Sequence, residues 1–226
     1  MPYIDTNHHS IYYELTGPDA GEAIVFLPGL TGDHNNWLLQ VNSFKESYRC
    51  LTFDWRDTGL SAPSPCEEYS LRDMAADVAG MITGLNLGKS HLVGLSMGGA
   101  VAQEVALNYP QLVATVTIAS SFSRRPSPSE LPHNKRTPGN LRQSMAVQFH
   151  DTVERLPHLR LPVLVIAGSR DRTTPPHEQK EMAGQIPGAE YVMIERAGHT
   201  VQVEKAGDFN RTLRAFLEAH PVSYTG

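Results

Sequence analysis

The alternation of short apolar runs with helical patterns, from about residue 48 onward, most constrains how this chain folds. Several runs are nearly all apolar, which is typical of parallel strands covered on both faces, whereas "SIYYELTG" alternates and fits an exposed edge strand. Because parallel strands need crossover connections, this order predicts an α/β fold with a doubly wound, mostly parallel sheet flanked by helices. The candidate strands are "SIYYELTG", "AIVFLPG", "RCLTFDW", "HLVGLS", "ATVTIAS", "VLVIAGS" and "YVMIERA".

Three helices are predicted between and after these strands. In "SLRDMAADVAGMITGL" apolar residues recur at three- and four-residue steps, and Ser70 with Asp73 resembles a capping box. A second helix is expected over residues 98–109, because Pro110 ends it. A third helix is expected in "DFNRTLRAFLEAH", where one stripe is apolar: Phe209, Leu213, Phe216 and Leu217.

One stretch interrupts this alternation. With 226 residues and 24.9 kDa, the chain has the size of a single α/β domain, so we expect one domain over residues 1–226. Residues 121–162 begin with a polar tract rich in Pro, Ser and Arg and continue into the helix-like "LRQSMAVQFHDTVERLPHL". A loop of that length inside a compact domain is usually functional or mobile, so we interpret 121–162 as a small cap or lid insertion.

Composition and charge limit the partners of the chain. The net charge of −5 and pI of about 6.0 do not favour nucleic acid or an anionic membrane, so we expect a small-molecule substrate and a monomer or small homo-oligomer. No basic segment is followed by an apolar run near the N-terminus, and no segment approaches about 18 consecutive apolar residues. Cytoplasmic residence is the simplest expectation, with Cys50 and Cys66 as free thiols.

A single serine within a glycine cluster is the first candidate for chemistry. "GLSMG" satisfies the G-x-S-x-G pattern, with the apolar "HLVGL" before it and the helical "GAVAQEVALNY" after it. A tight strand-to-helix turn holds Ser96 in a strained backbone conformation, and side chains at Gly94 or Gly98 would collide with neighbouring backbone. We therefore predict Ser96 as a nucleophile at the carboxyl end of the sheet, the alternative being an ordinary glycine-rich turn.

A serine nucleophile needs a base and a carboxylate that orients the base. In this architecture they follow in the order Ser, acid, His. Asp171 lies just past the strand "VLVIAGS", and His199 lies just past the strand "YVMIERA". The alternatives are that Asp171 caps the segment at "TTPPHEQ" or pairs with a flanking arginine, and that His199 is a hydrogen-bonded loop residue.

The attack on a carbonyl also needs donors for the oxyanion. The backbone N–H of Met97, the residue after the nucleophile, is one candidate. The N–H of Leu30 in "IVFLPGLTGDHNNW" is the other, although Pro28 and Gly29 also fit an ordinary turn. No His, Cys or carboxylate pair has convincing metal spacing, so no metal and no cofactor is predicted.

These motifs together resemble the α/β-hydrolase fold family, of the serine esterase type with a short cap. The resemblance covers nearly the whole chain outside the insertion and implies Ser96 as nucleophile, His199 as base, Asp171 as acid, and Leu30 and Met97 as oxyanion donors. The matching segments, in order, are "LPGLTGDHNNW", "FDWRDTGLSAP", "GLSMGGAVAQ", "AGSRDRTTPP" and "AGHTVQVEKAGDFNRTLRAFL".

Two positions depart from the family pattern. Pro28 stands where the family often has His, and "RDTG" at 56–59 replaces the commoner arginine-glycine-histidine-glycine form, as in some ester-cleaving members such as aclacinomycin methylesterases. The short cap implies a more open and less selective site.

The resulting functional hypothesis is a carboxylesterase, which cleaves a small-molecule ester through an acyl-enzyme. Lactonases, C–C bond hydrolases, thioesterases and perhydrolases share the triad, and a non-catalytic ligand-binding protein shares the fold. Epoxide hydrolases and haloalkane dehalogenases are disfavoured, because resemblance to them would place Asp at this turn, where the chain has Ser96. A basic cluster in the insertion either selects anionic substrates or, as is more common, forms a solvated loop face: Arg124, Arg125, Lys135 and Arg136.

Overall fold

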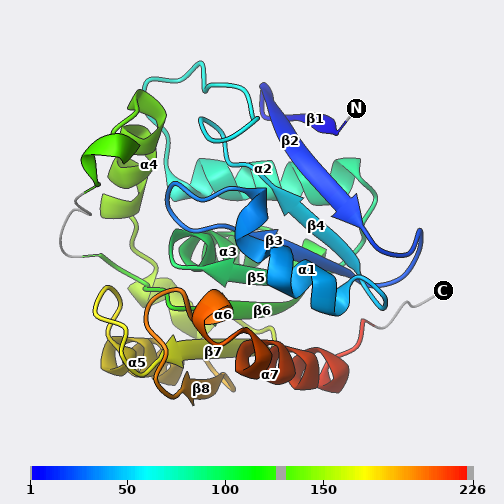
Figure 1. Ribbon diagram of the computed structural model, residues 1–226, viewed down its shortest axis with the longest axis vertical. Coiled ribbons are helices and arrows are strands. Elements are labelled where there is room, and N and C mark those ends of the chain that lie inside the picture. Colours follow the sequence, from blue (N-terminus) through cyan, green and yellow to red (C-terminus); the bar gives the residue numbers. More distant parts are fainter. Residues whose placement is uncertain (1, 126–130, 223–226) are drawn as a thin grey trace.

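The structure, a computed structural model, describes residues 2–125 and 131–222. Its described strands form one eight-stranded sheet in the order β1-β2-β4-β3-β5-β6-β7-β8 (Figure 1). All pairs from β4 to β8 are parallel, whereas β2 is antiparallel to both β1 and β4. The predicted doubly wound, mostly parallel sheet is therefore confirmed. The strands are β1 Tyr3–Thr6, β2 His9–Thr16, β3 Ala23–Leu27, β4 Arg49–Phe53, β5 Ser90–Leu95, β6 Val113–Ala119, β7 Val163–Gly168 and β8 Glu190–Ile194.

The edge of the sheet differs from the prediction. β2, the "SIYYELTG" run, is the second strand, and the unpredicted β1 forms the edge. The two strands are joined by Asn7 and His8, whose φ angles of 47° and 64° are typical of a two-residue hairpin turn. Because β1 is only four residues long and its turn contains no glycine, neither the strand nor the turn gives a clear sequence signal.

The three predicted helices are confirmed as α2, α3 and α7, each within two residues of its expected bounds. The capping box of α2 is present, with Ser70 and Asp73 each accepting from the backbone N–H of the other. The α-helices are α1 Leu38–Phe44, α2 Leu71–Gly84, α3 Met97–Asn108, α4 Pro138–Gln148, α5 Pro176–Gln185, α6 Val201–Glu204 and α7 Ala206–Ala219. The short 3-10 helices are η1 His34–Trp37, η2 Pro110–Leu112, η3 His133–Lys135 and η4 Val153–His158.

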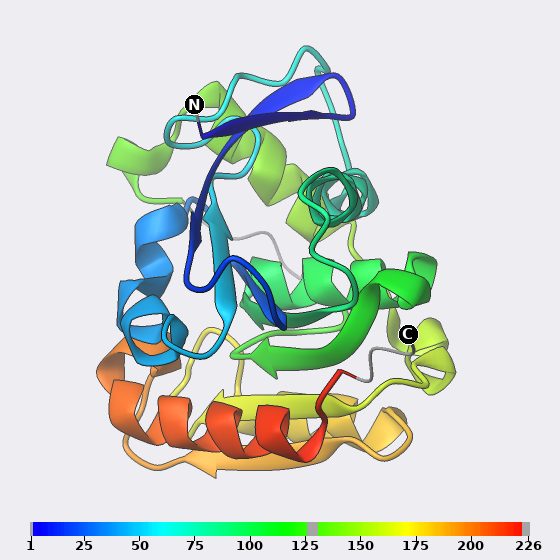
Figure 2. The same cartoon turned by 90° about the vertical axis from the view of Figure 1, so that its right-hand side faces the viewer.

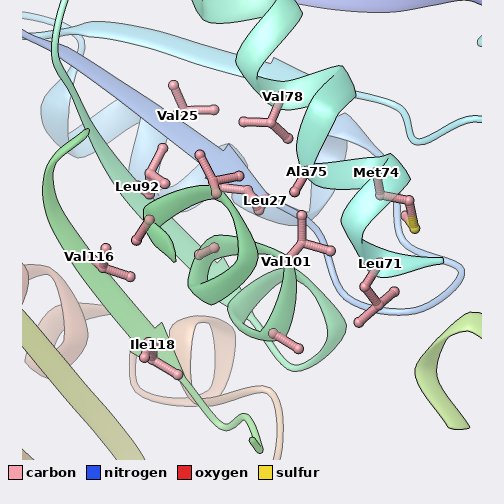
Figure 3. Close-up of a cluster of buried hydrophobic side chains, with 14 of the residues drawn as sticks. Val25, Leu27, Leu71, Met74, Ala75, Val78, Leu92, Val101, Val116 and Ile118 are labelled. Atoms are coloured by element: carbon pink, nitrogen blue, oxygen red, sulfur yellow. The ribbon is translucent and has the colours of Figure 1, made fainter. Parts of the chain in front are cut away.

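Helices lie on both sides of the sheet (Figure 2), and an apolar core fills the space between the sheet and each helical layer. Successive strand residues point to opposite faces, so Val25 and Leu27 of β3 belong to the core beneath α2 and α3, while Phe26 belongs to the core beneath α1 and α7. Figure 3 shows the first core, in which Val101 of α3 and Val78 of α2 lie over the strands. Burial on both faces explains why these strands read as continuous apolar runs.

The segment 121–162, hereafter the cap segment, leaves the sheet after β6 and returns at β7. The predicted helix over 141–159 is wrong in its extent, because the chain forms α4, then a break, then η4. At the break, Thr152 donates its N–H to Ser123 O (2.9 Å) and its hydroxyl to Gln103 Oε1 (2.7 Å). The first bond joins the beginning of the cap segment to its later part, and the second ties it to α3 of the main domain, where a continuous helix over 141–159 would not reach. Residues 126–130 of the predicted loop lie outside the described residues.

Two further predictions concern the state of the cysteines and the apolar character of the helices. Cys50 is buried and Cys66 is exposed, and both are free thiols, as predicted. Within residues 2–125 and 131–222, no helix has the length and apolar character needed to cross a membrane.

Candidate active site

Ser96 occupies the turn between β5 and α3, where the sequence predicts a nucleophile. Its φ of 53° and ψ of −117° lie outside the regions that residues with side chains favour. The backbone on either side fixes this conformation: Ser96 donates its N–H to Ala119 O (2.9 Å), and the Ser121 hydroxyl donates to Ser96 O (2.6 Å). The strain is therefore held by contacts from the end of β6.

The flanking glycines are required by space. A Cβ atom at Gly94 would lie 2.3 Å from Gly98 O, and one at Gly98 would lie 2.1 Å from Leu27 O. Both distances are far shorter than a van der Waals contact, and the groups in the way are backbone atoms that no side-chain rotation can move. The predicted steric role of these glycines is confirmed.

The structure brings Ser96, His199 and Asp171 into one hydrogen-bonded series. His199 Nε2 lies 3.0 Å from Ser96 Oγ, and Nδ1 of the same ring lies 2.9 Å and 3.1 Å from the two carboxylate oxygens of Asp171. Asp171 follows β7 and His199 follows β8, so both loops leave the carboxyl edge of the sheet beside the turn that carries Ser96. The predicted nucleophile, base and orienting acid therefore lie within hydrogen-bond reach of one another.

Asp171 is buried and also organises its own loop. It accepts hydrogen bonds from the backbone N–H groups of Thr173 (2.9 Å) and Thr174 (3.0 Å) and from the Thr174 hydroxyl (2.7 Å). Burial raises the pKa of Asp171, but the hydrogen bonds from His199 and Thr174 outweigh it and hold the pKa below its ordinary value. The carboxylate therefore stays charged at neutral pH.

Of the two alternative roles considered for Asp171, the structure shows the first, shaping the loop that follows it, and not the second, an ion pair with a flanking arginine. Asp171 does turn the loop before α5, but among the described residues neither flanking arginine forms an ion pair with it. Thr174 was not among the predicted site residues, although an Asp followed two and three residues later by Thr is a recognisable side-chain turn signal.

A cavity of about 360 Å³ opens beside Ser96, and both predicted oxyanion donors line it. Met97 is the first residue of α3, so its N–H has no partner within the helix. Leu30 lies in the loop after β3, which passes so close to Ser96 that a Cβ atom on Gly29 would lie 3.6 Å from Ser96 Cβ. Leu30 and Met97 thus lie on the wall of the same cavity as Ser96.

The Leu30 loop is held in place by two side chains that lie far from it in the sequence and were not predicted as part of the site. Trp55 Nε1 donates to Pro28 O (3.0 Å), and Gln143 Oε1 of α4 accepts from Thr31 N (3.2 Å). Gln143 Nε2 also donates to Thr58 Oγ1 (2.7 Å) and to Arg56 O (3.1 Å), both in the loop after β4. No local pattern marks a glutamine that acts across 112 positions.

The cap segment supplies much of the apolar wall of this cavity through Phe122, Leu131 and Val147. Across the part of the chain that the structure describes, no group of three or more His, Cys, Asp or Glu side chains is placed to hold a metal ion. The cavity therefore combines apolar walls with one hydrogen-bonded Ser–His–Asp series.

A strained serine at the carboxyl edge of a doubly wound sheet, joined to histidine and aspartate from later loops, defines a hydrolase of the α/β class. Comparison with known families agrees. Residues 22–149, more than half of the chain, match the family described as alpha/beta hydrolase fold, and residues 142–222 match one described as TAP-like protein. The chain belongs to the alpha/beta hydrolase fold family, as its motifs predict.

The similarity to individual proteins covers most of this chain and most of each of theirs. The chain is 24% identical to "Putative carbamate hydrolase RutD" of Pseudomonas syringae pv. syringae (strain B728a), with 88% of this chain and 94% of that protein aligned. It is similar to the structure of a thermophilic esterase from Thermogutta terrifontis with malate bound (25% identity, TM-score 0.87, 96% and 97% covered). It is also similar to Est816, described as an N-acyl homoserine lactone degrading enzyme (26% identity, TM-score 0.83, 95% and 100% covered). These comparisons place the chain among hydrolases of this fold.

Proposed function

We propose that the chain is a serine carboxylesterase in which Ser96, His199 and Asp171 form the catalytic triad. The observation that carries this proposal is the 3.0 Å contact between His199 Nε2 and Ser96 Oγ, with Asp171 on the other ring nitrogen. A serine hydroxyl is a poor nucleophile until a base removes its proton, and this geometry supplies the base in the required orientation.

The reaction then proceeds in two halves. His199 takes the Ser96 proton as Oγ attacks the ester carbonyl, and the N–H groups of Leu30 and Met97 stabilise the negative oxygen. His199 returns the proton to the leaving alcohol, which leaves an acyl group on Ser96. His199 then takes a proton from a water molecule, whose oxygen attacks the acyl carbon. The bond to Ser96 Oγ breaks, His199 returns the proton to Oγ, and the carboxylic acid leaves the regenerated enzyme.

A lactone is the second candidate substrate, because Est816, one of the structures that the chain is similar to, is described as lactone-degrading. A lactone is a cyclic ester, so the same two half-reactions open its ring. The relatives named as carbamate hydrolases add carbamates to the panel. A comparison of rates on esters, lactones, carbamates and thioesters distinguishes these substrate classes.

The substitution Ser96→Ala tests the proposal. We expect hydrolysis of a short-chain nitrophenyl ester to fall by at least about 10³-fold, because the nucleophile is lost while the binding groups remain. Thermal unfolding checks that the variant is folded. A fluorophosphonate probe should label the wild-type protein at Ser96.

Two outcomes would contradict the proposal. Full activity of Ser96→Ala would exclude this serine as the nucleophile. A folded wild-type protein that neither hydrolyses any member of the panel nor reacts with the probe would favour a non-catalytic binding protein of the same fold.

A further inference from the structure

The basic cluster of the cap segment separates into two kinds of residue. Arg124 forms an ion pair with Asp151 (2.6 Å), Arg136 Nε donates to Leu131 O (2.9 Å), and Lys135 is exposed in η3. These three side chains form the solvated loop face that such clusters usually make. Arg125 is different.

Arg125 lines the same cavity as Ser96 and His199. It is half-buried, its guanidinium carbon lies 5.6 Å from the centre of the Phe122 ring, and its Nη1 donates to Thr173 O (3.3 Å). Its Nε is buried and has no hydrogen-bond partner. The guanidinium is thus held from two sides with part of its donor capacity unused.

Arg125 lies between two hollows that differ in charge. The outer one is also lined by Arg124, Arg172 and Glu178, and the inner one is the cavity beside Ser96. Among the described residues that line the cavity, no carboxylate is present, and Arg125 is the one permanently charged side chain. A positively charged donor that is partly removed from water and not neutralised gains most from an anionic partner. The planar guanidinium matches a carboxylate, which accepts two of its N–H groups at once.

We propose that Arg125 binds a carboxylate of the substrate, so that the preferred substrates are small esters or lactones that carry a second, free carboxylate. This inference rests on the proposed function, because the cavity must also hold the acyl group at Ser96. The volume of about 360 Å³ is suited to a small ligand of this kind. The charge of Arg125 makes the cavity selective, although its cap is short.

Matched substrates test the inference. Monomethyl glutarate and dimethyl glutarate share one acyl chain, but only the monomethyl ester carries a free carboxylate. A cyclic pair is γ-butyrolactone-γ-carboxylate and its methyl ester, for which opening of the lactone ring is measured. We expect wild-type kcat/KM to favour the anionic member by about tenfold at low ionic strength, with the preference weakened by salt. Arg125→Gln should remove the preference, mainly through KM, and Arg125→Lys should keep part of it.

Arg124→Gln is the matched control, because the neighbouring arginine carries the same charge but does not line the cavity. It should keep the wild-type preference. A wild-type enzyme with no preference for the anionic member, or an Arg125→Gln variant that loses activity equally on both members, would overturn the inference.

A second measurement works without turnover. Glutarate should slow fluorophosphonate labelling of Ser96 in the wild-type protein, while neutral glutaramide should not, and Arg125→Gln should need about tenfold more glutarate for the same protection. Labelling without protection by glutarate overturns the role of Arg125 alone. Absence of labelling together with absence of hydrolysis overturns the proposed function itself.

Discussion

Asp171 performs two tasks with one carboxylate. One task is to accept from the His199 ring, and the other is to accept from Thr173 and Thr174 and so shape the loop that presents it. A loop that depends on its own acid for its shape keeps that acid in a fixed orientation. In the proposed triad, this carboxylate holds the His199 ring in the tautomer that leaves Nε2 free to accept the Ser96 proton.

The substitution Asp171→Asn separates these tasks. The amide oxygen still accepts from the loop N–H groups, but the charge that stabilises protonated His199 is lost, so kcat should fall by about 10³- to 10⁴-fold. Steady-state kinetics and thermal unfolding measure the two effects. Asp208→Asn, at an exposed position of α7, is the control. A kcat within tenfold of wild type would contradict the assigned role.

At the scale of elements, α4 connects the cap segment to the loop that holds Leu30. Gln143 is fully buried and joins Thr31 to the loop after β4, while Arg142 forms an ion pair with Asp57 (2.6 Å). The cap helix is therefore part of the support of the candidate oxyanion site. A change within α4 should reach the chemistry through this loop.

The substitution Gln143→Leu tests that support. It leaves the Thr31 N–H without its partner and, among the described residues, removes one of the two donors to Arg56 O, the other being the Thr58 hydroxyl (3.4 Å). These losses should lower the free energy of unfolding by about 2 kcal/mol. The loosened loop should also lower kcat/KM by about tenfold. Gln148→Leu, on the exposed face of α4, is the control for both measurements. Equal behaviour of the two variants would show that Gln143 does not position the loop.

The same elements indicate how far the sequence predicts the fold and the site. Ser96, Asp171 and His199 were predictable because each follows a buried strand, and parallel strands bring their carboxyl ends to one edge. Contacts that depend on side-chain packing were not predictable. The hydrogen bonds of Gln143 join residues that are 85 to 112 positions apart in the sequence. The sequence also does not indicate that Arg125, of four similar basic residues, is the one that lines the cavity.

At the scale of the whole molecule, His150, just after α4, links the cap segment to α3. Its ring is buried against Glu104 of α3, with Nδ1 3.7 Å from the carboxylate, and it lies edge-on to Phe122. Asp151 and Arg155 are the other charged groups that act on it. Burial dominates and lowers the pKa of His150 to about 4, so the folded protein holds this ring in its neutral form.

This lowered pKa predicts acid sensitivity. Between pH 6.5 and about 4 the unfolded chain binds a proton at His150 that the folded chain does not, so the free energy of unfolding should fall by up to about 3 kcal/mol as pH decreases through this window. Denaturant unfolding measured across this range should have a flatter pH dependence in His150→Gln. His158→Gln, at an exposed position, should keep the wild-type slope. An unchanged slope in His150→Gln would contradict the prediction.

The contact between Ser96 and His199 spans 103 positions of the chain. During synthesis the serine leaves the ribosome long before the histidine, and the base arrives only when β8 has been made and added to the sheet. Until then the proposed base is absent, so Ser96 lacks the group that would activate it in the proposed triad. If the proposed triad is correct, reactivity of Ser96 therefore appears only after β8 and the loop that carries His199 have joined the sheet, late in the assembly of the fold.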